Sequence, residues 1–127
     1  MKYSNRIFLP VVAVILFAAF MTRAADPAPD EVSAALRRSA DWQLANPSGI
    51  DTRFWTIAPL YDGLLRLAVT TGDPKYLAAV LRFGTQSGWM PGDRVYHADD
   101  HAVGHAWLDV YRMNTNQAER LGPVRER

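Results

Sequence analysis

One stretch near the C-terminal end of the sequence, residues 96–111, combines several side chains that can do chemistry. It holds the three histidines of the chain and a pair of adjacent carboxylates: His97, Asp99, Asp100, His101 and His105. Imidazoles and carboxylates so close together can exchange protons with a substrate, and two histidines four residues apart on a helix can share a zinc ion. The pattern therefore indicates either an acid–base site or a metal site.

The spacing argues against the metal. The zinc-protease pattern requires Glu at position 102, where this sequence has Ala102, and His97 is expected to precede the helix rather than lie on it. The sequence predicts no metal and no other cofactor. Adjacent carboxylates usually point in different directions, so the alternative for Asp99 and Asp100 is helix capping with one solvated partner.

A helix must hold this cluster in place. Apolar residues recur at intervals of three and four after the cluster, which is the pattern of one buried helical face: Val103, Ala106, Trp107, Val110 and Tyr111. We therefore predict a helix from about His101 to Met113, with Asp99 or Asp100 capping its first turn.

The first two expected helices are separated by a stop signal at Asn46–Gly49. The first runs from Glu31 to about Ala45, with Asp30 as its N-cap. Its expected apolar face consists of Val32, Ala35, Leu36 and Trp42. The second begins near Trp55 or Thr56 and continues to about Thr71, because Pro59 fits only in a first turn.

Turn residues delimit two further helices. Gly72 is a natural C-cap, Asp73 an N-cap and Pro74 a first helical residue, so a third helix should run from Pro74 to about Thr85. Gln117–Leu121 should begin a last helix, which Gly122 and Pro123 break, leaving residues 124–127 as a tail that packs on nothing. Setting Gly63 against Gly104 superposes the two halves at an offset of 41 residues. An all-α chain of helical hairpin repeats is predicted.

The N-terminal residues resemble a secretory signal peptide. Lys2 and Arg6 precede an apolar run from Ile7 to Phe20, and small residues follow up to Ala24. Cleavage after residue 24 removes three of the fourteen Lys and Arg residues and none of the thirteen Asp and Glu residues, so the exported chain would be slightly acidic. This balance does not favour nucleic acid as a partner, and no stable membrane association is expected after cleavage. The sequence has no cysteine, so disulfides do not contribute to stability.

The segment FWTIAPLYDGLLRLAVTTGDPKYL, followed by HADDHAVGHAWLDVYRM, resembles the N-terminal part of the unsaturated glucuronyl and rhamnogalacturonyl hydrolases, glycoside hydrolase families 88 and 105. The resemblance covers about residues 30–121. It implies an (α/α)6 toroid, here incomplete, with residues 25–127 as the N-terminal part of that domain. It also implies an oligosaccharide substrate and hydration of the 4,5 double bond of a terminal unsaturated uronic acid, without a metal.

The resemblance also implies roles for single residues. Asp100 matches the first active-site Asp of the family, Asp99 is the second choice, and Trp55 matches an aromatic residue that lines the sugar site. His101 and His105 are expected to contact the substrate. The family's second essential Asp lies in a Trp-rich segment that this sequence does not contain. The alternatives are a secreted helical-repeat binding module and an inactive truncated remnant.

The four tryptophans have different expected positions. Trp42 and Trp107 are expected in the core, because aromatic residues at helical spacing usually pack there. Trp55 stands at the loop end of its helix and is expected to face a ligand. Trp89, in a Gly-rich loop, has no assigned position.

Overall fold

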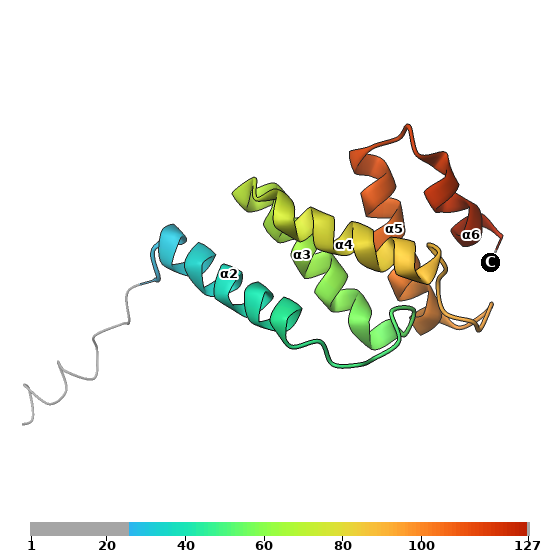
Figure 1. Ribbon diagram of the computed structural model, residues 1–127, viewed down its shortest axis with the longest axis horizontal. Coiled ribbons are helices and arrows are strands. Elements are labelled where there is room, and N and C mark those ends of the chain that lie inside the picture. The colour runs from blue at the N-terminus through green and yellow to red at the C-terminus, as the bar shows by residue number, and fades with distance from the viewer. Residues whose placement is uncertain (1–25, 127) are drawn as a thin grey trace, which may run out of the picture.

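The computed structural model describes residues 26–126. All regular secondary structure in this part is helical, which confirms the all-α class (Figure 1). The α-helices are α2 (Pro29–Ala45), α3 (Ala58–Thr71), α4 (Pro74–Ser87), α5 (Ala102–Met113) and α6 (Gly122–Arg125). Three short 3-10 helices stand beside them: η1 (Trp55–Ile57), η2 (Ala98–His101) and η3 (Ala118–Leu121).

The tight turn between α3 and α4 has the predicted form. Gly72 adopts a left-handed conformation with φ 67°, and its N–H donates to the carbonyl of Ala68 at 2.9 Å. The carboxylate of Asp73 accepts from the backbone N–H of Lys75 at 3.1 Å, and Pro74 begins the next helix. The turn makes α3 and α4 antiparallel neighbours. Helix α4 extends two residues beyond the predicted end, to Ser87, because Gly88 takes the left-handed capping position with φ 62°.

The core lies between α3, α4 and α5. Its fully buried large side chains are Tyr61, Leu64 and Leu65 of α3, Tyr76 and Val80 of α4, and Val103, Trp107 and Val110 of α5. The rings of Tyr61 and Trp107 lie 5.2 Å apart between centroids, so one aromatic contact joins α3 to α5. The prediction that Trp107 is a core residue is confirmed. Burial also raises the pKa of the Tyr61 hydroxyl, which donates to the carbonyl of Thr52 at 2.9 Å.

Helix α2 differs from the prediction in how it packs. None of its residues is buried, and the expected apolar face is largely exposed: Val32 by 41%, Leu36 by 50% and Trp42 by 61%. The placement of Trp42 in the core was therefore wrong. Asp30 does not cap the helix either, since Ala28 occupies the N-cap position and Asp30 lies in the first turn.

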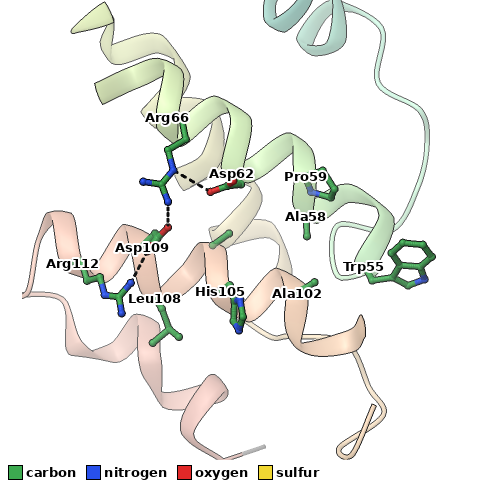
Figure 2. Close-up of a pocket in the computed structure, with 11 residues that line it drawn as sticks. Trp55, Ala58, Pro59, Asp62, Arg66, Ala102, His105, Leu108, Asp109 and Arg112 are labelled. Carbon is green, nitrogen blue, oxygen red and sulfur yellow. Dashed lines mark hydrogen bonds and ion pairs between the residues drawn. The ribbon is translucent and has the colours of Figure 1, made fainter. Parts of the chain in front are cut away.

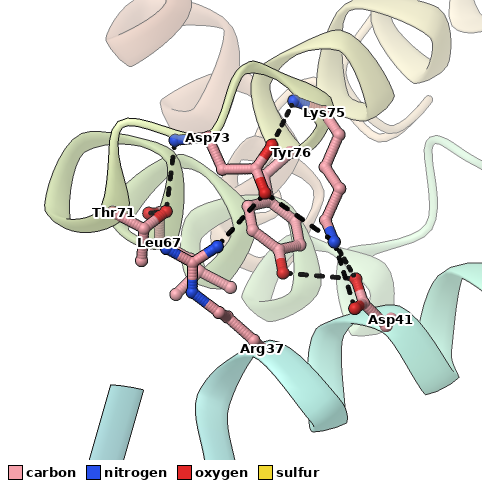
Figure 3. A network of polar contacts seen from close by, with 7 residues as sticks. All are labelled: Arg37, Asp41, Leu67, Thr71, Asp73, Lys75 and Tyr76. Atoms are coloured by element: carbon pink, nitrogen blue, oxygen red, sulfur yellow. Dashed lines mark hydrogen bonds and ion pairs between the residues drawn. The ribbon is translucent and has the colours of Figure 1, made fainter. Parts of the chain in front are cut away.

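Polar contacts attach α2 to the rest of the molecule (Figure 3). Asp41 lies 2.9 Å from the Nζ of Lys75 and accepts from the Tyr76 hydroxyl at 3.2 Å. Arg37 donates to the Asp73 carboxylate at 3.2 Å. The apolar residues of α2 that pack against the core are Ala40 and Leu44, which were not among the predicted ones. Periodicity therefore identified the wrong stripe, and the ion pairs of Arg37 and Asp41 lie beside the stripe that docks.

The start of α5 also differs from the prediction. Residues 98–101 form η2, and α5 begins at Ala102 with His101 as its N-cap. No side chain caps the N-terminus of η2 or of α5 by a hydrogen bond. The expectation that Asp99 or Asp100 caps the helix was therefore wrong. The carboxylate of Asp100 is bound by a different residue, Arg94.

The C-terminal segment packs against the core instead of trailing from it. Gly122 and Pro123 do not break the helix but begin α6, where Pro needs no backbone N–H in the first turn. Val124 is partly buried against the core and lies beside Gly104 of α5. The expectation of an unpacked tail was therefore wrong for Val124.

Two expectations remain predictions. The proposed signal peptide, residues 1–24, lies outside the described residues. Among residues 26–126, no helix is both long and apolar enough to cross a membrane. The five α-helices described here agree with an all-α fold, and the toroid of twelve helices stays a prediction.

Candidate functional site

Among residues 26–126, Asp100 is the one buried charged residue, with 6% of its surface exposed. Arg94 donates to both of its carboxylate oxygens, from one terminal guanidinium nitrogen at 2.6 Å and from Nε at 3.0 Å. The backbone N–H of Arg94 adds a third bond at 2.8 Å. These hydrogen bonds lower the pKa of Asp100 to about 2, the side chain of Arg94 being the largest cause. Asp100 is therefore ionised at any ordinary pH.

A glycine allows this pair to form. Gly92 donates its N–H to the carbonyl of Asp100 at 2.8 Å, which brings the loop onto η2. A Cβ at position 92 would lie 2.5 Å from both Cβ and Cγ of Asp100, well inside van der Waals contact. Only a residue without a side chain fits between the loop and this carboxylate.

Asp99 has a different environment from its neighbour. Its side chain is 55% exposed, and its carboxylate lies 3.9 Å from Nδ1 of His97. The same nitrogen lies 3.9 Å from Asp100. It is also the single buried side-chain nitrogen or oxygen in residues 26–126 without a hydrogen-bond partner. One imidazole thus faces two carboxylates, of which Asp99 is the one open to solvent.

These residues line a pocket of about 480 Å³, called here the carboxylate pocket. Phe54 and Trp55 are its aromatic lining residues, and Arg53 donates to Asp93, also in the lining, at 2.7 and 3.3 Å. Trp55 is 40% exposed, so part of its ring is open to contact. The full lining is Asp51, Arg53, Phe54, Trp55, Gly92, Asp93, Arg94, His97, Asp99 and Asp100.

A second pocket of about 560 Å³ lies on the other side of Trp55, between α3 and α5; it is called here the arginine pocket (Figure 2). Trp55 stands at one end of it, and His105 lies on its α5 wall. At the far end, Asp109 of α5 lies 3.4 Å from Arg66 of α3 and 2.9 Å from Arg112. Because Trp55 lines both pockets, the two form neighbouring parts of one surface.

The predicted site residues are thus divided between the two pockets. Asp99, Asp100 and Trp55 share the carboxylate pocket, and Trp55 and His105 share the arginine pocket. His101 lines neither. Its Nε2 lies 2.7 Å from the carbonyl of Val95, to which it can donate, so it fastens the loop to the start of α5.

Sequence reasoning did not identify the arginines of either pocket. Arg94 and Arg53 are separated by forty-one positions, and Arg66 lies off the apolar stripe of its helix. The signal for Arg94 was weak but present, because a basic residue in the Gly-containing loop precedes Asp100 by six positions. Partners on separate elements, such as Arg66 and Asp109, become visible only when α3 and α5 pack together.

Within residues 26–126, no group of three or more His, Cys, Asp or Glu side chains is arranged to hold a metal ion. His97, His101 and His105 do not converge: one faces the carboxylates, one contacts a carbonyl and one lies in the second pocket. The chemistry available in the two pockets is that of carboxylates, imidazoles, guanidiniums and an aromatic ring.

Comparison with known proteins supports a distant relationship to a class of glycoside hydrolases. The chain is 30% identical over 81 residues to an unsaturated 3S-rhamnoglycuronyl hydrolase from Formosa agariphila. The match covers 63% of this chain and 22% of that protein, so the chain matches about one fifth of the relative's length. No family model matches the chain. No solved structure matches it either.

Proposed function

We propose that the chain is a glycoside hydrolase that acts on oligosaccharides ending in an unsaturated uronic acid. The observation that carries this proposal is the carboxylate pocket, in which Asp99, Asp100 and the exposed ring of Trp55 face one space. Aromatic faces pack well on the apolar faces of sugars, and carboxyl groups can transfer protons to a sugar held there. The distant relative is named for a reaction on an unsaturated rhamnoglycuronyl sugar, which supports the same substrate class.

The proposed reaction needs one proton donor and one water molecule. A carboxylic acid protonates C4 of the double bond, positive charge develops at C5, and water adds there while its proton returns to the carboxylate. The resulting hemiketal opens and releases the neighbouring sugar as an alcohol. The acid is regenerated, so no metal or redox partner enters the balance.

The geometry favours Asp99 over Asp100 as the proton donor. With a pKa of about 2, Asp100 is protonated in only about one molecule in 10⁵ at pH 7, and Arg94 already occupies both of its oxygens. Asp99 is open to the pocket and lies beside His97. We propose that Asp99 transfers the proton, while Asp100 orients Arg94 and the loop. Asp100 remains the choice that the family resemblance implies, and the two assignments give opposite results on mutation.

The test uses the full chain and an oligosaccharide with a terminal 4,5-unsaturated uronic acid, followed by loss of the double-bond absorbance. Asp99→Asn should lower kcat by about 10²-fold or more if it transfers the proton, within the range found for acid–base groups. Asp100→Asn should lower activity less and shift the melting temperature. Asp30→Asn, on exposed α2, is the matched control and should change neither the activity nor the melting temperature.

A reversed order, with Asp100→Asn abolishing turnover in a folded protein and Asp99→Asn nearly normal, would assign the chemistry to Asp100. Absence of turnover in the wild-type chain would overturn the enzymatic proposal.

A binding function without chemistry is the second candidate, and one observation favours it. The carboxyl group named by the resemblance is tied to Arg94, whereas both pockets are open and lined by groups that bind sugars. A binding module, or a remnant that has lost its activity, would bind the oligosaccharide and leave its double bond intact. Calorimetric binding combined with unchanged absorbance would identify this case.

We also propose that the chain is exported after removal of residues 1–24. The basic start, apolar run and small residues of that segment support this proposal. The intact mass and N-terminal sequence of the protein purified from its own source test it, and a retained residue 1 would contradict it.

A further inference from the structure

The arginine pocket contains side chains that the proposed reaction does not use. We infer that Arg66 and Arg112 bind the acid group of an internal sugar, so that the substrate is an acidic oligosaccharide lying along a groove from Trp55 to these arginines. This inference rests on the proposed function, because it places the reacting end of the sugar in the carboxylate pocket.

The two guanidiniums are held in place and remain open to solvent. Asp109 is 25% exposed and bridges them, at 3.4 Å from Arg66 and 2.9 Å from Arg112 (Figure 2). The arginine side chains themselves are 73% and 75% exposed. Each guanidinium carries five N–H donors in a planar fork, and the contacts with Asp109 and Asp62 occupy only some of them. Donors suited to a carboxylate therefore face the pocket.

Stability does not explain these ion pairs. Pairs between side chains as exposed as Arg66 and Arg112 contribute little to folding, because water screens the charges and holding the long side chains costs entropy. The core lies on the other face of α3 and α5, at Tyr61, Leu64 and Trp107. The polar face is therefore available for binding.

The two pockets differ in the net charge of the Asp and Arg side chains that line them. The carboxylate pocket is lined by four Asp side chains against two Arg side chains, which leaves two negative charges. The arginine pocket is lined by two Asp and two Arg side chains, so these charges balance. A second acid group, on a sugar beyond the reacting one, is therefore better accommodated in the arginine pocket than in the carboxylate pocket.

The separation of Trp55 from Arg66 means that the bound acid group belongs to a different sugar from the one that contacts Trp55. Trp55 and Arg66 are eleven positions apart, which corresponds to about 16 Å at the helical rise. A single sugar ring on Trp55 is too short to reach the arginines. His105 lies between the two ends on the α5 wall, where it can contact the intervening sugar. The groove thus predicts a preference for longer acidic chains.

The experiment is calorimetry at low salt with the full chain and three probes. These are unsaturated tetragalacturonate, its fully methyl-esterified form, and unsaturated digalacturonate, which is too short to reach Arg66. The wild type should bind the acidic tetramer more tightly than the ester or the dimer. Arg66→Gln and Arg112→Gln should each weaken binding of the acidic tetramer by about 10-fold, as expected on losing a charge-assisted hydrogen bond. Binding of the ester and of the dimer should not change.

Arg82→Gln, on the exposed surface of α4 outside both pockets, is the matched control and should bind all three probes as the wild type does. Equal binding of acid and ester by the wild type, or equal effects of the three Arg variants, would overturn the inference and leave the proposed function standing. Arg-dependent binding of the acidic tetramer without turnover would support the subsite and overturn the enzymatic proposal. No binding of any probe would overturn the subsite.

Discussion

At the scale of single residues, the pair of Asp99 and Asp100 shows how neighbours in sequence acquire different chemistry. Asp100 points inward, where Arg94 donates to both oxygens and its pKa falls to about 2. Asp99 points outward and keeps an open carboxylate beside His97. Two carboxylates with such different surroundings can take different roles in one site.

The Arg94–Asp100 pair predicts a specific loss of stability in acid. The pKa of Asp100 is lowered on folding from its usual value near 4 to about 2, so the carboxylate favours the folded state above pH 4. This contribution disappears as the pH falls from about 4 to about 2. Thermal melts of wild type and Asp100→Asn across pH 2–7 should differ at neutral pH and converge near pH 2. Parallel curves over the whole range would contradict the prediction.

Two glycines with opposite surroundings give a matched pair of variants. Gly92→Ala places a Cβ 2.5 Å from Asp100 and should destabilise the protein by about 1–3 kcal/mol, since the ion-paired carboxylate must shift. Gly63→Ala, in the middle of α3 with no atom within 4 Å, should stabilise it by about 0.5–1 kcal/mol. Urea unfolding of the two variants measures both values. Equal changes in the free energy of unfolding for the two variants would contradict the close contact between Gly92 and Asp100.

At the scale of elements, α2 is attached differently from the other long helices. Helices α3, α4 and α5 share a core of aromatic and aliphatic side chains, whereas α2 fully buries no residue. It is held by the partly buried Ala40 and Leu44 and by the ion pairs of Arg37 and Asp41. Ion pairs at the surface are weak compared with apolar burial. Helix α2 should therefore open before the rest of the molecule does.

This difference can be measured by hydrogen exchange. Asp41→Asn removes the negative charge that pairs α2 with Lys75 and should speed exchange of the α2 amides while leaving α5 unchanged. Because the contact with Lys75 lowers the pKa of Asp41, acidification below pH 4 should loosen α2 in the wild type in the same way. Asp30→Asn serves as the control on the same helix. Uniform exchange across α2 and α5 would disprove separate opening of α2.

At the scale of the whole molecule, an apolar groove of about 320 Å³ separates α2 from α3. Leu36 and Ala40 line one side, and Pro59, Leu60 and Leu67 line the other. Apolar surface of this kind favours contact with other apolar surface.

We therefore predict concentration-dependent self-association of the chain in sedimentation velocity experiments. Leu36→Gln introduces a polar group into the groove and should shift the protein towards monomer. Val69→Gln is the matched control, because Val69 is 70% exposed on α3 but lies outside the groove. A wild-type protein that stays monomeric at every concentration, or equal effects of both variants, would exclude association through the groove.

The amino-acid sequence by itself determined the helical class, the turn at Gly72–Pro74, the burial of Trp107 and the place of the Asp99–Asp100 cluster before α5. These features follow from local rules: the spacing of apolar residues, the left-handed conformation open to glycine, and the fixed φ of proline. They are readable because each depends on residues only a few positions apart.

Only the tertiary structure decided which partners the residues of that cluster have and which helices lie beside one another. It turned Asp100 onto Arg94, left Asp99 open and brought Arg66 of α3 beside Asp109 of α5. It also docked α2 through Ala40, Leu44 and its ion pairs instead of through the predicted apolar face. It also placed Trp55 between two pockets. The physical reason is that the ion pair of Arg66 and Asp109 joins residues 43 positions apart, and the pockets join residues still further apart. Helical periodicity carries no information about which helices become neighbours.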